Sequence, residues 1–196
     1  MGPTGDLLVI GLGNPGSRYE GTRHNVGAEA VELLASRGGG RLKDDRKVSA
    51  RVGDVRVGSV RLHLAVPTTF MNESGRSVSQ LLRRHEVDSW DRLVVVHDEL
   101  DLDPATIKVK LGGGLAGNNG LRSITEHLRT QDYARVRIGI GKPPGGPDRG
   151  ADWVLSKVPK SARADLDVAI VEAADAVELI ATDGVAAAMQ RFNARA

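Results

Sequence analysis

One histidine and one run of carboxylates are the side chains in this sequence best suited to acid–base chemistry. His24 lies just before an apolar helical pattern, and Asp98 follows the apolar run at residues 94–96. A carboxylate that accepts one ring N–H of an imidazole fixes its tautomer and raises the basicity of the other nitrogen. A lone histidine is more often structural, and carboxylates that end a strand can also bind Mg²⁺ or be solvated turn residues. The pair alone leaves these alternatives open.

Two glycine-rich segments could bring backbone amides close to a ligand. Residues 11–16 match the GxGxxG pattern of dinucleotide-binding proteins, but that pattern needs a helix to begin within the glycines. The helical pattern here begins only near Val26, so a nicotinamide-dependent oxidoreductase is the weaker alternative. Residues 110–123 hold five glycines and two asparagines without the GKS or GKT ending of a phosphate-binding loop, so a flexible connection remains an alternative there.

The elements that must position these residues are predicted by the apolar patterns. Runs typical of strands occur at residues 6–10, 61–66, 92–96, 106–111 and 135–140, and residues 48–60 predict a hairpin that turns at Gly53-Asp54. Helical spacing occurs at residues 26–34, with Asn25 as a candidate N-cap, and at residues 78–82, 121–128 and 162–181. Residues 143–150, rich in Pro and Gly, predict a surface loop. This alternation predicts an α/β fold with a mixed, mostly parallel, twisted sheet flanked by helices.

Length and composition limit the class of protein. A chain of 196 residues suits one domain, residues 1–196, with a single core. The absence of cysteine excludes disulfides, thiolate metal sites and a cysteine nucleophile, and it fits the reducing cytoplasm. Residues 1–6 lack a cationic leader and the apolar run at residues 7–12 is too short to span a membrane, so we expect a soluble protein. The net charge of +2 fits either a polyanionic partner or an ordinary solvated surface.

Taken together, these segments resemble bacterial-type peptidyl-tRNA hydrolases along nearly the whole chain. The matching motifs occur in the family's order and spacing: GLGNPG at 11–16, Tyr19, TRHNVG at 22–27, PTTFMN at 67–72, HDELDL at 97–102, KLGGG at 110–114 and RIGIG at 137–141. The resemblance implies hydrolysis of the ester that joins a peptide to its tRNA, which recycles tRNA during translation. It also implies that His24 is the catalytic base and Asp98 its partner. Water is the expected nucleophile, because the chain has neither a GxSxG elbow nor a cysteine.

The resemblance also assigns residues to the two parts of the substrate. It implies that neutral amides and two rings bind near the ester, namely Asn14, Tyr19, Phe70, Asn72 and Asn119. It implies that basic side chains bind tRNA phosphates, namely Lys108, Lys110 and Arg137, although each could equally be a solubilising surface residue. No cofactor and no metal ion are expected, and the lack of a self-complementary apolar stripe favours a monomer.

One position departs from the family pattern. Members usually read Gly-His-Asn-Gly where this chain has Gly117-Asn118-Asn119-Gly120. Asn118 can form hydrogen bonds but cannot titrate, so its role stays open. A tRNA-binding protein without catalysis is a further alternative, and the retained His24 and Asp98 weigh against it, because a protein that only binds needs no base.

Overall fold

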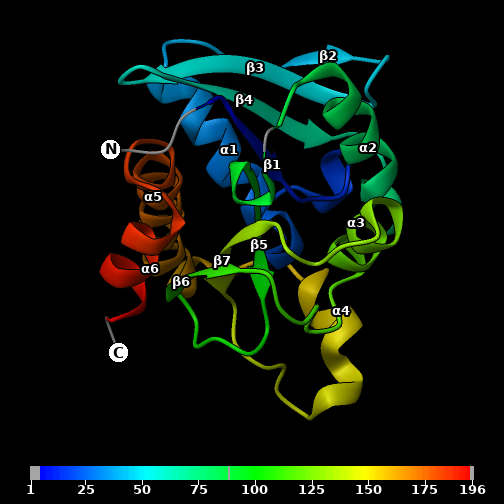
Figure 1. Ribbon diagram of the computed structural model, residues 1–196. Coiled ribbons are helices and arrows are strands. Elements are labelled where there is room, and N and C mark those ends of the chain that lie inside the picture. Colours follow the sequence, from blue (N-terminus) through cyan, green and yellow to red (C-terminus); the bar gives the residue numbers. More distant parts are fainter. Residues whose placement is uncertain (1–4, 88, 195–196) are drawn as a thin grey trace.

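A single seven-stranded sheet forms the centre of the molecule (Figure 1). The computed structural model describes residues 5–87 and 89–194 of the 196-residue chain. Its strands are β1 (Leu7–Gly11), β2 (Lys43–Asp45), β3 (Ala50–Val57), β4 (Val60–Pro67), β5 (Leu93–Glu99), β6 (Ile107–Leu111) and β7 (Ala134–Gly139). Its α-helices are α1 (Val26–Arg37), α2 (Ser74–Arg84), α3 (Asn119–Leu128), α4 (Gly150–Val154), α5 (Lys160–Asp183) and α6 (Val185–Asn193).

The strand order is β2-β3-β4-β1-β5-β7-β6. The four central strands, β4, β1, β5 and β7, pair in parallel, whereas β2, β3 and β6 pair antiparallel toward the two edges. Every residue of β1 and β5 is buried, as expected for parallel strands that are covered on both faces. The predicted mixed α/β sheet flanked by helices is therefore confirmed.

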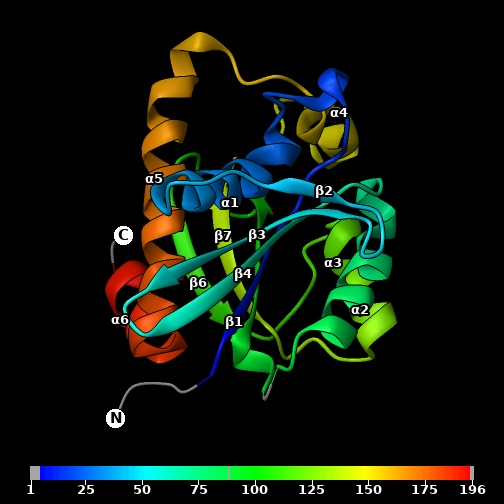
Figure 2. The same cartoon turned by 90° about the horizontal axis from the view of Figure 1, so that it is seen from above.

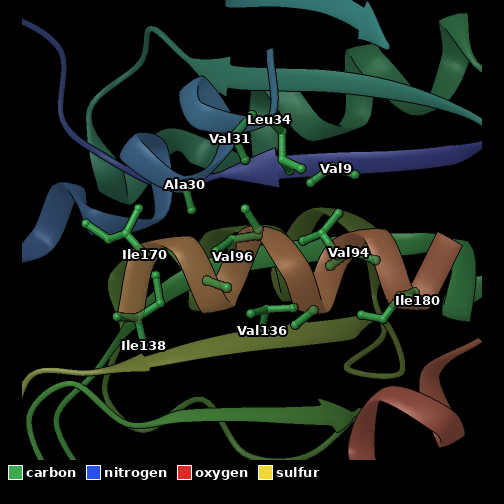
Figure 3. Close-up of a cluster of buried hydrophobic side chains, with 14 of the residues drawn as sticks. Val9, Ala30, Val31, Leu34, Val94, Val96, Val136, Ile138, Ile170 and Ile180 are labelled. Carbon is green, nitrogen blue, oxygen red and sulfur yellow. The ribbon is translucent and has the colours of Figure 1, made fainter. Parts of the chain in front are cut away.

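Helices cover both faces of the sheet because successive strand residues point in opposite directions. One face packs Val94, Val96 and Val136 against α1, α5 and α6, and Figure 3 shows Ile170 and Ile180 of α5 directed toward these strands. The opposite face packs Ile10 and Val95, among others, against α2 and α3. Figure 2 shows α5 and α6 on one side of the sheet and α2 and α3 on the other. The predicted helix at residues 162–181 lies within α5 and packs on the sheet as expected.

The predicted hairpin is present, but its turn lies at a different place. Gly53 and Asp54 lie inside β3, where Gly53 pairs with Leu64, and the chain reverses between β3 and β4 at residues 58–59. Gly58 has φ of 59°, a conformation that a tight two-residue turn requires and that glycine adopts without strain. A turn there lets all eight residues of β3 pair with β4, whereas a turn at Gly53 would break that ladder.

The sequence had predicted neither the nine-residue helix α6 nor, apart from the 3-10 turns, two shorter elements. The three-residue strand β2 extends the sheet at one edge, and α4 begins at Gly150, the last residue of the predicted loop 143–150. Both are too short to carry a periodic apolar pattern, so no signal in the sequence marks them. None of the helices described is both long enough and apolar enough to cross a lipid bilayer.

Candidate active site

The candidate site lies at the edge of the sheet where the parallel strands β4, β1 and β5 end. Adjacent parallel strands carry their carboxyl ends to the same edge, which is where ligands collect in open α/β sheets. Asn14 follows β1, Asp98 lies within the last residues of β5, and Phe70 and Asn72 follow β4. The order of these strands in the sheet, β4-β1-β5, makes the three segments spatial neighbours.

His24 and Asp98 form a buried pair at the centre of this edge. His24 lies in the 3-10 turn Arg23–Asn25 directly before α1, and its Nδ1 is 2.9 Å from both Oδ1 and Oδ2 of Asp98. The two residues retain only 7% and 3% of their accessible surface. When Nδ1–H donates to the carboxylate, Nε2 is the ring nitrogen left to accept a proton.

A glycine allows the helix after His24 to approach the strand that carries Asp98. A Cβ atom at Gly27 would lie 2.1 Å from the backbone oxygen of Val96 in β5, far closer than real contacts allow. Only a residue without a side chain therefore permits this contact between α1 and β5. Gly27 lies three residues after His24 and Val96 two residues before Asp98, so this contact lies beside the His24–Asp98 pair.

The electrostatic environment favours the protonated form of His24. Burial is the largest single effect and lowers the pKa, but the negative charge of Asp98 and its hydrogen bond together outweigh burial, so the pKa is raised above its ordinary value of 6.5. The neighbouring His97 is different: it is fully buried and donates from Nδ1 to the backbone oxygen of Asp98 at 2.8 Å. Burial lowers the pKa of His97 to about 4.

Asn14 is held in place by Asn25. The backbone N–H of Asn14 donates to Oδ1 of Asn25 at 2.8 Å, and Nδ2 of Asn25 donates to the backbone oxygen of Asn14 at 2.9 Å. Asn14 Oδ1 in turn accepts from the backbone N–H of Met71 at 2.7 Å. The predicted role of Asn25 was wrong in part: it occupies the N-cap position of α1, but its side chain makes no capping hydrogen bond and binds Asn14 instead.

Four of the five predicted substrate residues, all except Tyr19, line one open cleft of about 290 Å³ beside His24. Its lining includes five of the residues singled out in the sequence: Asn14, His24, Phe70, Asn72 and Asn119. The Tyr19 ring meets the Phe70 ring edge-on at 6.5 Å between centroids, and Phe70 is 54% exposed. A second hollow of about 280 Å³ shares His24 and Asn119 and adds Asp98, Glu99 and Asn118. The tertiary structure thus brings these residues together around the His24–Asp98 pair.

One wall of the cleft comes from a segment that the sequence did not implicate. Ala151, Val154 and Leu155, in and after α4, line the same cleft as the asparagines. Arg23 binds this segment through two contacts. Its guanidinium lies 3.6 Å from the centre of the Trp153 ring, and its Nη1 donates to Ser156 Oγ at 2.6 Å. These partners lie more than a hundred residues from Arg23, so no local pattern could have linked them.

The predicted basic residues lie outside the cleft, on β6 and β7. The strand register pairs Lys108 with Arg137, so these two side chains share one face of the sheet, and Lys110 follows on the same face two residues along. Arg137 reaches toward the site, because its Nη1 lies 3.6 Å from Oε1 of Glu99, which lines the second hollow. Its neighbour Arg135 is buried and donates to the backbone oxygens of Gly113 and Gly114.

The carboxylates at the end of β5 are engaged by protein groups. Asp98 accepts from His24 and Asn118, and Glu99 lies beside Arg137 and accepts from the backbone N–H of Asp101 at 3.5 Å. Within residues 5–87 and 89–194, no group of three or more His, Cys, Asp or Glu side chains has a metal-binding arrangement. Of the three interpretations of this acidic run, the burial of Asp98 and its contact with His24 favour the carboxylate that orients an imidazole.

The fold and the site together define a class of protein: a mixed α/β protein in which a buried His–Asp pair, of the kind used in general acid–base catalysis, lies beside a cleft lined by neutral amides. The comparisons with known proteins agree. The family model for peptidyl-tRNA hydrolase matches residues 8–196. The peptidyl-tRNA hydrolases of Cutibacterium acnes and Rhodococcus erythropolis are each 49% identical to this chain, over 95% and 97% of it and 97% and 99% of their own lengths.

A solved structure shows the same fold. The crystal structure of peptidyl-tRNA hydrolase from Acinetobacter baumannii superposes with a TM-score of 0.89 at 40% identity, covering 96% of this chain and 95% of that one. The chain therefore belongs to the peptidyl-tRNA hydrolase family. Its reaction is hydrolysis of the ester bond of peptidyl-tRNA, which releases free tRNA and the peptide.

Proposed function

We propose that this hydrolysis uses water activated by His24, with Asp98 as the group that orients the imidazole. The observation that carries the proposal is the buried His24 Nδ1–Asp98 contact of 2.9 Å at the wall of the amide-lined cleft. His24 Nε2 takes a proton from water as the water oxygen bonds to the ester carbonyl carbon. When the tetrahedral intermediate collapses, the C–O bond to the tRNA ribose breaks and the proton passes from His24 to the leaving oxygen.

The asparagines supply contacts that do not depend on peptide sequence. Asn14, Asn72 and Asn119 line the cleft, and each amide can donate and accept hydrogen bonds with a peptide backbone. One such donor aimed at the carbonyl oxygen would stabilise the developing oxyanion by roughly 3 kcal/mol. The edge-on rings of Tyr19 and Phe70 offer a surface for stacking at the ester end. Neutral amides also disfavour the charged free amine of an aminoacyl-tRNA.

The tRNA backbone would bind on the face formed by β6 and β7. Lys108 and Arg137 lie opposite each other there, with Lys110 beside them, and Arg137 is next to a hollow that opens on His24. Cations in such an array bind phosphates without reading sequence, which suits an enzyme that must accept many tRNAs. We further propose that the protein acts as a monomer in the cytoplasm, where its substrate arises. Light scattering of the purified protein and cell fractionation test these two points.

The deciding experiment is release of labelled N-acetylated amino acid from tRNA by the purified, chelator-treated protein. Unblocked aminoacyl-tRNA serves as the competing substrate. His24→Ala is expected to lower turnover by about 10²–10⁴-fold, because a positioned general base is lost, with tRNA affinity little changed. His127→Ala, which removes an exposed imidazole near the end of α3, is the matched control and should behave as wild type. Near-normal turnover of His24→Ala would refute the assignment of the base.

A further inference from the structure

Asn118 joins two parts of the molecule through one side-chain amide. Its Oδ1 accepts from the backbone N–H groups of Gly120 and Leu121 at 2.9 and 3.1 Å, which makes it the N-cap of α3. Its Nδ2 donates to Oδ1 of Asp98 at 3.4 Å. The residue is 8% exposed, although it lies in a glycine-rich loop.

The orientation of this amide is dictated by its neighbours. Two backbone donors require an acceptor, so the oxygen must face α3 and the NH₂ group must face the carboxylate of Asp98. The reversed amide would set donors against donors and an oxygen against a negative charge. Donors at Oδ1 also polarise the amide and strengthen the hydrogen bond that Nδ2 makes.

Asp98 has room for the second donor. His24 Nδ1 is equidistant from both carboxylate oxygens, but a single ring hydrogen cannot satisfy both, and a carboxylate accepts several hydrogen bonds. Asp98 is 3% exposed. Among the residues that the structure describes, His24 and Asn118 are the side chains that donate to its carboxylate.

We propose that Asn118 is a positioning residue for catalysis: it anchors the Asp98 carboxylate to the amino end of α3 and thereby fixes the imidazole of His24. This inference rests on the proposed role of His24 as the base. Asn118 itself touches neither the water nor the ester in this role. The Nδ2 donor of Asn118 also stabilises the negative charge of Asp98, so this charge attracts the protonated imidazole of His24 less strongly. The positive amino end of the ten-residue helix α3 stabilises the Asp98 charge further.

Two substitutions separate this role from helix capping alone. Asn118→Ser and Asn118→Asp both keep an N-cap acceptor. The melting temperature of Asn118→Ser should stay close to that of wild type, whereas Asn118→Asp should melt at a lower temperature, because it places a second carboxylate against the buried Asp98. Both lose the Nδ2 donor. Because one hydrogen bond is lost from the reacting arrangement, kcat of Asn118→Ser should fall by about 3- to 10-fold with little change in KM.

The pH dependence gives a readout that a capping role would not change. Without the Asn118 donor, the full charge of Asp98 acts on His24, so the acid limb of the kcat/KM profile should move to higher pH in Asn118→Ser. It should move further in Asn118→Asp, which adds a second carboxylate. NMR titration of the His24 imidazole in the free enzyme should show the same order of pKa values, independently of turnover.

The outcomes distinguish the two proposals. If both variants keep wild-type kcat, the wild-type acid limb and the wild-type His24 titration, Asn118 is only a cap and the inference fails. If His24→Ala, assayed beside them, retains turnover, then the proposed base is wrong, whatever the Asn118 variants show.

Discussion

Replacing Asp98 by Asn tests the His24–Asp98 pair with almost no change in volume. In the wild type, Asp98 accepts from both His24 Nδ1 and Asn118 Nδ2. An asparagine at position 98 has only one oxygen for these two donors, and its NH₂ group would face one of them. His24 can relieve the conflict by moving its proton to Nε2 and accepting at Nδ1. That tautomer has no free basic nitrogen directed at water.

The size of the loss follows from the interactions removed. A hydrogen bond to a charged partner contributes about 1.5–3 kcal/mol, and each 1.4 kcal/mol in the barrier is roughly tenfold in rate. We therefore expect kcat of Asp98→Asn to fall by about 10- to 100-fold at a pH where wild-type His24 is neutral. Any population of the wrong tautomer adds to this loss.

The same variant should change the pH profile in a defined direction. Burial alone lowers the pKa of His24, whereas the charge of Asp98 and its hydrogen bond raise it. A general base works only when unprotonated, so wild-type activity should fall as the pH drops through a pKa above 6.5. Without the charge of Asp98 the pKa falls, the acid limb moves to lower pH, and the ratio of wild-type to variant activity narrows as the pH is lowered.

The assay is steady-state release of N-acetylated amino acid from tRNA over a range of pH. Asp101→Asn, which neutralises an exposed carboxylate three residues further along, is the matched control and should leave rate and profile unchanged. Activity of Asp98→Asn within about twofold of wild type, or an acid limb that does not move, would show that Asp98 does not act on His24 in the way the geometry indicates.

Three further predictions follow from the packing and charges. Gly27→Ala should lower the free energy of unfolding by about 1–3 kcal/mol in urea titrations and reduce turnover. The reason is that the new Cβ would overlap the backbone oxygen of Val96 and push α1 away from β5. Unchanged free energy of unfolding and unchanged turnover would contradict this prediction. The pKa of His97 is about 4 in the folded protein against an ordinary 6.5, so between these pH values the unfolded chain binds a proton that the folded protein does not. The free energy of unfolding should therefore fall by up to about 3 kcal/mol as the pH is lowered from 6.5 to 4. His97→Gln should lack this part of the pH dependence, and the same pH dependence in both proteins would refute the prediction. Arg137→Gln should reduce the slope of log affinity for tRNA against log salt by about one, whereas Arg56→Gln on β3 should not.

The fold class and most of the residues that line the candidate site could be predicted from the sequence. Buried parallel strands need continuous apolar runs and amphipathic helices need apolar spacing, so local composition already marked β1, β5 and α1. The motifs around His24 and Asp98 could be recognised because each is a short contiguous stretch with its own chemistry. The residue types of each segment, and their spacing, can be read directly from the sequence without knowing what the segment packs against.

The tertiary structure decided which of those residues meet. His24 and Asp98 are 74 positions apart, and only the pairing of β1 with β5 and the close approach at Gly27 bring them within a hydrogen bond. The turn at Gly58 in place of Gly53 and the hydrogen bonds between Asn25 and Asn14 depended on pairings between residues 11 positions apart, which the apolar spacing of the chain does not reveal. The role of Asn118 is the clearest case: the sequence left it open, because an amide acquires its function only from the groups placed at its two ends.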